Sequence, residues 1–310
     1  MLQTILLKAG GLTIRALNRT LKRLFDDCNT SLNIACQSFG DLSRLDLGLQ
    51  LHSLEVSLGK IIISSKALTS ITVDGDSFCR KGFWPFPSEK SVDVFVTSLA
   101  TLKGLHALNL SSCRIESAGA ASLAPSLMLL TGLHTLILSE NFIGSAGAAS
   151  LAPSLMLLTG LHTLNLSDNF IGSAGAASLA PALMLLTGLH TLILSENVIG
   201  AAGAASLASS LVLLTGLKTL SLDGNKVGPT GAASLTPSLM ALTGLRQLDF
   251  SNNDLEPADK AFLRSSLTQL TGLHKLYLRD SEYASYSDFD SHSEDYSDNE
   301  DDENVAGASL

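Results

Sequence analysis

Residues 133–160 read LHTLILSENFIGSAGAASLAPSLMLLTG, and residues 161–188 repeat this stretch with changes only at Asn165, Asp168 and Ala182. The same 28-residue period runs through the middle of the chain. The leucines that open successive units are Leu105, Leu133, Leu161, Leu189, Leu217, Leu245 and Leu273. One unit buries too few aliphatic side chains to compensate for ordering its own backbone. The units are therefore expected to stack and to share one core.

The first half of each unit predicts a short strand that ends in a buried asparagine. In the unit from Leu133, the spacing is L-x-x-L-x-L-x-x-N-x-I, so Leu136 and Leu138 point inward and Ile137 points outward. An asparagine amide at this point can bond backbone groups of its own unit and of the next. The sequence therefore predicts a ladder of Asn141, Asn169, Asn197, Asn225 and Asn253, with Cys113 in the same position of the first regular unit.

The second half of each unit predicts a helix. Leu151, Leu155 and Leu158 recur at helical spacing, and Ser145 is the expected N-cap. Pro153 lies inside this segment and lacks a backbone donor. We therefore expect two short helical pieces, or a kink, in place of one regular helix.

These residues resemble the leucine-rich repeats of the ribonuclease-inhibitor type, which also occur in Ran GTPase-activating proteins and NOD-like receptors. The resemblance covers Leu105 to Arg279. It implies an α/β solenoid in the form of a curved horseshoe, with parallel strands inside and short helices outside. It also implies a binding surface on the concave face.

Charge divides the chain unevenly. All 20 Lys and Arg precede Asp280, whereas 11 of the 29 acids lie from Asp280 onward, so the body is near +2 and the tail carries −11. Four regions follow from charge and pattern: 1–40 is a basic helical region and 41–104 holds degenerate repeats that form an N-terminal cap. Residues 105–279 hold the regular repeats, and 280–310 form an acidic tail that is expected to be disordered.

The predicted concave face supplies the candidate partner-binding residues, because its outward positions vary more than the rest of the unit. Mild acidity is its one chemical bias, and drift on an unused surface would give the same variation. The candidates are Asn109, Ile137, Glu140, Asn165, Asp168, Ile193, Glu196, Ser221, Asp249 and Tyr277.

One repeat position is repeatedly histidine. Stacked strands would bring neighbouring rings to about 5 Å, which suits a pH-sensitive or metal-binding row. Duplication of a single surface residue explains the row equally well, and no carboxylate accompanies it. The members are His106, His134, His162, His190 and His274.

No motif argues for catalysis, a cofactor or a metal. The sequence has no GxSxG or HExxH motif, and its repeated Gly144-containing loop lacks the lysine of a phosphate-binding loop. A nearly neutral body argues against nucleic acid. The uncharged stretch from Phe142 to Ser167 contains Pro, Gly and His, which argues against a membrane span. The protein is expected to be a monomer in the cytoplasm. The nucleus is one alternative location, and the mitochondrion is another because the basic N-terminus also suits a mitochondrial presequence.

The leading hypothesis is a non-enzymatic scaffold that binds a protein partner of unknown identity on the concave face. The first alternative is a Ran-type small-GTPase activator or regulator, an analogy that leaves a regulatory enzyme-activating role open. The second alternative is a tail that binds basic proteins such as histones. Candidate phosphorylation sites in the tail, each with an acid three residues later, are Ser285, Ser287, Ser291 and Ser297.

Overall fold

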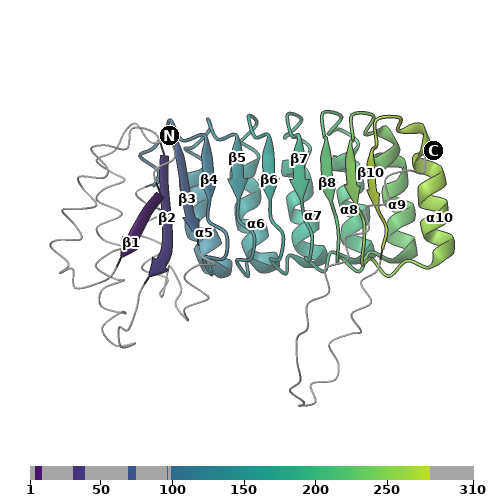
Figure 1. The fold of residues 1–310 in the computed structure, drawn as a ribbon, viewed down its shortest axis with the longest axis horizontal. Helices are drawn as coiled ribbons and strands as arrows, with labels where there is room; N and C mark the ends of the chain where they lie inside the picture. Colours follow the sequence, from purple (N-terminus) through teal and green to yellow (C-terminus); the bar gives the residue numbers. More distant parts are fainter. Residues whose placement is uncertain (1–3, 9–30, 39–68, 75–95, 97–98, 280–310) are drawn as a thin grey trace, which may run out of the picture.

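The computed structural model describes residues 4–8, 31–38, 69–74, 96 and 99–279, whose strands and helices stand side by side in one row (Figure 1). Within these residues, ten parallel strands pair strictly in sequence order as one sheet. The strands are β1 (Thr4–Lys8), β2 (Ser31–Ser38), β3 (Ser70–Asp74), β4 (Ala107–Asn109), β5 (Thr135–Ile137), β6 (Thr163–Asn165), β7 (Thr191–Ile193), β8 (Thr219–Ser221), β9 (Gln247–Asp249) and β10 (Lys275–Tyr277).

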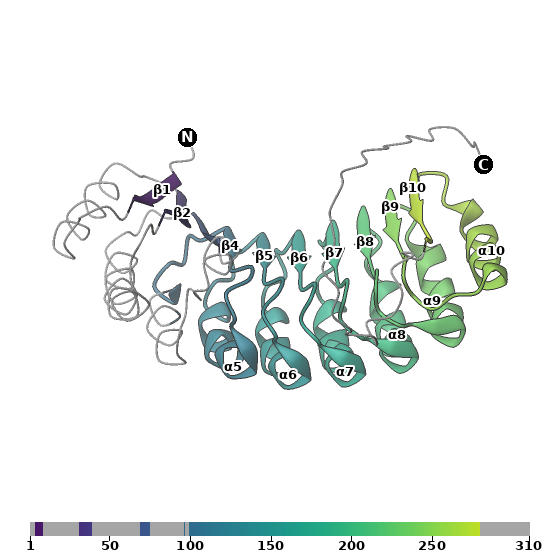
Figure 2. The same cartoon turned by 60° about the horizontal axis from the view of Figure 1, so that its bottom comes forward.

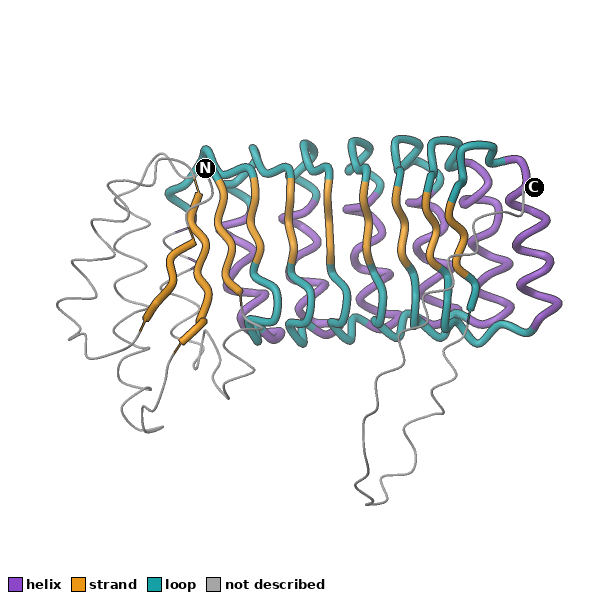
Figure 3. Tube along the Cα trace, viewed as in Figure 1, coloured by secondary structure: helices purple, strands orange, loops and turns teal. Residues whose placement is uncertain are grey.

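A helix follows each strand from β4 to β9 and packs behind the sheet. The helices are α5 (Glu116–Leu127), α6 (Gly144–Leu155), α7 (Gly172–Leu183), α8 (Gly200–Leu211), α9 (Gly228–Ala241) and α10 (Pro257–Ser266), which continues into the 3-10 turn η1 (Leu267–Gln269). Figure 2 shows the strands on the inside of the arc and the helices outside, and Figure 3 separates the two layers by colour. Helices are wider than strands, so stacking both in one array bends it. The predicted α/β leucine-rich repeat solenoid is confirmed.

The core is the layer between strands and helices. Leu136 and Leu138 from the strand half are both fully buried, and Leu151, Leu155 and Leu158 from the helical half are 0–1% exposed. Equivalent leucines of the other units are buried in the same way and belong to the same continuous cluster. The structure therefore confirms the inward stripe that the repeat predicts.

The predicted asparagine ladder is present and joins neighbouring units. Asn197 is fully buried, and its Oδ1 accepts from the backbone N–H groups of Asn169 at 3.1 Å and Ile171 at 3.3 Å. Its Nδ2 donates to the carbonyl of Leu166 in the preceding unit at 2.8 Å and to that of Leu194 in its own unit at 3.0 Å. The same bonds recur at Asn141, Asn169, Asn225 and Asn253.

Two expectations about the helices are wrong. Pro153 lies inside one continuous helix, α6, so the predicted break into two pieces does not occur. Pro153 and Ala149, whose carbonyl loses a partner at that proline, are both exposed, so water can satisfy the freed group. Ser145 is not the N-cap either. The helix begins at Gly144 without a side-chain cap, and the N–H of Gly144 bonds the carbonyl of Asn169 at 2.8 Å.

The N-terminal region contributes strands that the sequence analysis did not predict. β1 and β2 lie within the predicted region 1–40 and extend the sheet beyond β3. β3 lies within the region 41–104 that is predicted to hold degenerate repeats, and its fully buried Ile71 is in register with Leu108. The rest of the predicted basic helical region 1–40, the rest of the predicted cap and the acidic tail 280–310 lie outside the described residues.

Candidate functional site

The last residue of each strand forms a row across the concave face. Parallel pairing sets Asn109 beside Ile137, then Asn165, Ile193 and Ser221, and the row continues to Asp249 and Tyr277. These side chains are half-buried except Tyr277, which is 39% exposed. All seven candidate residues of the strand row thus lie together as predicted. Their side chains differ from unit to unit while the leucines behind them do not.

The remaining three candidates, Glu140, Asp168 and Glu196, form a second row in the loops that leave the strands. Each has a positive φ of 53–58°, a conformation that an L residue adopts at some cost, and this backbone fixes the side chains side by side. Glu140 accepts a 2.9 Å hydrogen bond from the Ser112 hydroxyl. The carboxylate of Glu196 lies so close to Gly224 that a Cβ there would fall within 2.1 Å of it.

Asp223 joins these acids and was missed by the sequence analysis. It takes the place of the serine found in neighbouring units at Ser139, Ser167 and Ser195, and Asn252 donates a 2.8 Å hydrogen bond to its carboxylate. The departure from the repeated serine was the signal that could have found it.

Crowding and burial act on the acids of this face. Desolvation, followed by repulsion from Glu140 and Asp223, raises the pKa of Asp168. Burial, followed by repulsion from Asp223 and Asp168, also raises the pKa of Glu196, against a smaller lowering by Lys226. Burial raises the pKa of Asp223 as well, although the hydrogen bond from Asn252 works in the opposite direction. Ionising these acids therefore costs the folded protein free energy, and cationic groups placed beside them would lower that cost.

Replacing Asp168 with its neutral amide, Asp168→Asn, should stabilise the protein at neutral pH. The folded pKa lies above the ordinary 3.8, so ionisation of Asp168 disfavours the folded state. That penalty is absent below about pH 3.8, where the group is protonated in both states, and grows as the pH rises through the folded pKa. Because this carboxylate is well exposed, we expect a gain below about 1 kcal/mol.

Urea unfolding at pH 7 and at pH 3.5 measures this effect. The difference between Asp168→Asn and the unmodified chain should shrink at pH 3.5, and at pH 7 it should shrink in about 1 M salt. Asp254→Asn, at an exposed acid outside the row, is the matched control. A variant that is less stable than the unmodified chain at pH 7 would contradict the reading of the pKa shift.

The predicted histidine row is present at the opposite ends of the strands. Ring centroids are 5.0 Å apart for His106 and His134, 5.0 Å for His134 and His162, and 5.1 Å for His162 and His190. The predicted spacing is confirmed, and its pH-sensing role stays a prediction. Among the described residues, no group of three or more His, Cys, Asp or Glu is arranged to hold a metal ion.

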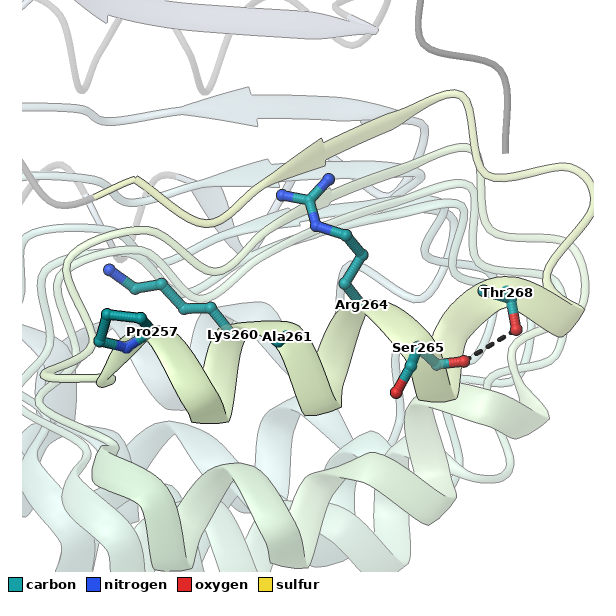
Figure 4. A pocket seen from close by; sticks show the side chains of 6 residues that line it. All are labelled: Pro257, Lys260, Ala261, Arg264, Ser265 and Thr268. Atoms are coloured by element: carbon teal, nitrogen blue, oxygen red, sulfur yellow. Dashed lines mark hydrogen bonds between the residues drawn. The ribbon is translucent and has the colours of Figure 1, made fainter.

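A hollow of about 500 Å³ lies on the exposed side of α10 and η1, at the C-terminal end of the array. Figure 4 shows Lys260 and Arg264 extending from the same side of α10, with the Thr268 hydroxyl bonded to the carbonyl of Ser265 at 2.8 Å. Pro257 and Ala261 complete the lining. Its basic lining differs from the acidic concave face, so we treat the hollow as separate from the candidate site.

No helix in the described part of the chain combines the length and the apolar character needed to cross a membrane.

Comparison with known proteins agrees with the repeat architecture. The family model described as "Leucine Rich repeat" matches residues 105–124, 159–180, 187–208 and 215–235. Each matched segment begins near the start of a unit and takes in its strand, its ladder position and most of its helix. These segments of the chain are leucine-rich repeats. Its unit length and its helix in each unit are compatible with the ribonuclease-inhibitor-like type.

The solved structures to which the chain is similar are distant. The leucine-rich repeat-containing protein LegL7 from Legionella pneumophila is 17% identical, with 90% of this chain and 91% of that chain covered and a TM-score of 0.46. A leucine-rich repeat protein from Leptospira interrogans is 16% identical, with coverages of 90% and 88% and a TM-score of 0.30. A chain of the Rad7 and Elc1 complex in yeast is 15% identical, with coverages of 87% and 77% and a TM-score of 0.35. No curated protein matches the sequence.

Proposed function

We propose that this protein is a non-enzymatic interaction scaffold that binds a protein partner on its concave face. The observation that carries the proposal is the contrast between the two sides of each strand. The inward positions are leucine in every regular unit except for Phe250, whereas the outward row runs from Asn109 and Ile137 through Ser221 to Asp249 and Tyr277. An open, curved row of differing side chains on a rigid array suits a broad surface contact with another protein.

The chemistry of the face supports a partner that presents cationic and amide groups. Glu140, Asp168, Glu196 and Asp223 crowd together, and the one cation that offsets their repulsion, Lys226 beside Glu196, does so only in part. A partner's Lys or Arg side chains placed over these acids would gain attraction and relieve the repulsion among them. Ile137 and Ile193 would supply apolar contact beside the acids.

Affinity capture from the native cell with two charge-matched double variants tests this proposal. Asn165→Arg with Ile193→Arg places two long cations in the strand row, and Ala146→Arg with Ala174→Arg places them on exposed positions of α6 and α7. We expect a protein captured by the unmodified chain to be lost, by at least about tenfold, only with the first pair. Equal capture by both pairs would overturn the concave-face assignment.

The two alternative functions make different predictions. A Ran-type regulator should accelerate GTP hydrolysis by its GTPase, although the described concave face between Arg114 and Lys218 has no basic residue to contact a nucleotide. A tail that binds basic proteins should lose its partner when residues 280–310 are removed. Capture that survives this truncation, together with unchanged GTP hydrolysis, would favour the concave-face scaffold over both.

A further inference from the structure

Eight large apolar side chains stand exposed along one edge of the array, in the turns that follow helices α5 to α8. Their exposed fractions run from 38% to 51%, although they sit in the midst of buried leucines. Each unit contributes the first two residues after its helix. We name this set the Met–Leu edge: Met128, Leu129, Met156, Leu157, Met184, Leu185, Val212 and Leu213.

The surroundings of the Met–Leu edge carry little permanent charge, with Lys218 at its C-terminal end. From 117 to 217 the sequence has no Lys or Arg, and its three acids, Glu140, Asp168 and Glu196, lie in the loops at the other end of the strands. The ionisable residues on the turns that lead from this edge to the strands are His134, His162, His190 and, after Val212 and Leu213, Lys218. Exposed prolines at Pro125, Pro153 and Pro181 extend the apolar surface along the helices.

The size of this surface sets it apart from scattered surface leucines. Monomeric proteins rarely expose contiguous apolar patches above a few hundred Å². Helices packed about 8–10 Å apart carry the Met–Leu edge over four units, a length of roughly 30–40 Å. With the flanking prolines and threonines, the edge approaches the roughly 800 Å² per partner that a stable interface needs.

The regular spacing of the apolar pairs on the Met–Leu edge indicates which kind of partner fits it. Apolar pairs recur once per unit, at intervals fixed by the stacking of this solenoid's own helices, which contact each other in sequence. A flat or irregular partner would leave alternate pairs unmatched. A second copy turned end to end carries the same interval, so its pairs fall in step with those of the first copy at every unit. Lys218 lies at one end of the edge, so a two-fold pair places the two copies' lysines at opposite ends and like-charge repulsion is small, although the whole chain has a net charge of −9.

We propose that two copies of this chain pair through the Met–Leu edge about a two-fold axis that passes between α6 and α7. In this arrangement Leu157 lies opposite Leu185 of the second copy, and Leu129 lies opposite Leu213. The proposal replaces the expectation of a monomer. It does not depend on the proposed function, because the edge lies at the other end of the strands from the acidic loops and leaves both concave faces open. The pair would hold two partner molecules at once, with the gain in avidity that such a link provides.

Analytical ultracentrifugation of the full chain measures the pairing. The unmodified chain at about 100 μM should have twice its monomer mass of 32.5 kDa. Leu157→Glu with Leu185→Glu should weaken the dimer at least about 100-fold, because a carboxylate would be buried without a partner. The matched control is Phe142→Glu with Phe170→Glu, at residues 50% and 60% exposed in the loops at the other end of the strands, and it should stay dimeric.

A milder pair, Leu157→Ser with Leu185→Ser, keeps the test decisive if the glutamate pair fails to fold. Disulfide trapping then checks the register. A chain with Leu157→Cys mixed with a chain with Leu185→Cys should cross-link above the background of the unmodified chain, whereas Leu157→Cys alone should not. A monomeric unmodified chain at about 100 μM, or a dimer that survives both Leu157 pairs, would overturn the proposal.

Two further outcomes would assign the edge to another arrangement. Growth beyond the dimer that is abolished by the Leu157 variants would indicate open-ended pairing, which overturns the two-fold axis. Co-flotation of the unmodified chain with neutral phosphatidylcholine vesicles, lost in the same variants, would make a lipid surface the occupant and would overturn pairing with a second copy.

Discussion

Replacing Asn197 with alanine, Asn197→Ala, is expected to lower the free energy of unfolding by about 3–5 kcal/mol. The side chain is fully buried and bonds backbone groups of its own unit and of the preceding one. Alanine would leave the buried N–H groups of Asn169 and Ile171 without this acceptor, and each such group costs about 1–3 kcal/mol. The carbonyls of Leu166 and Leu194 would each lose one of two amide donors. Urea unfolding followed by circular dichroism gives the difference.

Asn165→Ser is the matched control for this variant. Asn165 lies at the end of β6 on the concave face, where its Oδ1 accepts from the backbone N–H and the hydroxyl of Ser167 at 2.9 Å each. The equivalent residue of another unit is Ser221, so we expect a change below about 1 kcal/mol. Similar losses for Asn197→Ala and Asn165→Ser would show that the ladder contributes no more than a surface amide.

Replacing Gly203 with valine, Gly203→Val, should be comparably destabilising, by about 3 kcal/mol or more. Gly203 is buried in α8 where α7 approaches most closely. A Cβ there would lie 2.6 Å from Cγ2 of Ile199, 3.0 Å from Cα of Ser173 and 3.2 Å from Cβ of Ala176. The Ser173 contact is with backbone, which cannot move aside without separating two units that share a core. The same contacts recur at Gly147, Gly175 and Gly231.

Ala202→Val separates this packing effect from helix propensity. Ala202 is exposed in the same helix, so valine there should cost only its lower helix propensity, about 0.5–0.7 kcal/mol. Thermal unfolding of the two variants in parallel provides the comparison. If Gly203→Val is as stable as Ala202→Val, the close contact between α7 and α8 does not require glycine at this position.

Much of the fold could be predicted because the same pattern of residues recurs in several units. Leu136, Leu138 and Asn141 recur at one interval, and each recurrence confirms the role of the position. The strands β1 and β2 could not be found this way, since they lack the 28-residue pattern and are recognised only by pairing with β3. The break predicted at Pro153 was wrong because the sequence alone does not show that this side of the helix faces water, which can bond the carbonyl that the proline leaves without a donor.

The candidate site was predictable in outline only. The strand row followed from the period, but Asp223 was missed because its position is serine in the neighbouring units. The Met–Leu edge was missed for a different reason. Met156 and Leu157 stand in the unbroken apolar run LMLL, and the pattern alone does not show that the helix ends at Leu155 and turns them outward.

By itself the sequence determined which side chains are inside, since a 28-residue unit with this spacing of leucines has one way to bury them and must stack to do so. Only the tertiary structure decided what lies next to what across units. Strand pairing brings the rings of His134 and His162 to 5.0 Å and places Asp168 among like charges, while helix stacking lines up the exposed methionines and leucines. These neighbours are one unit apart in sequence, so their spacing and exposure depend on how the units pack and not on any local pattern.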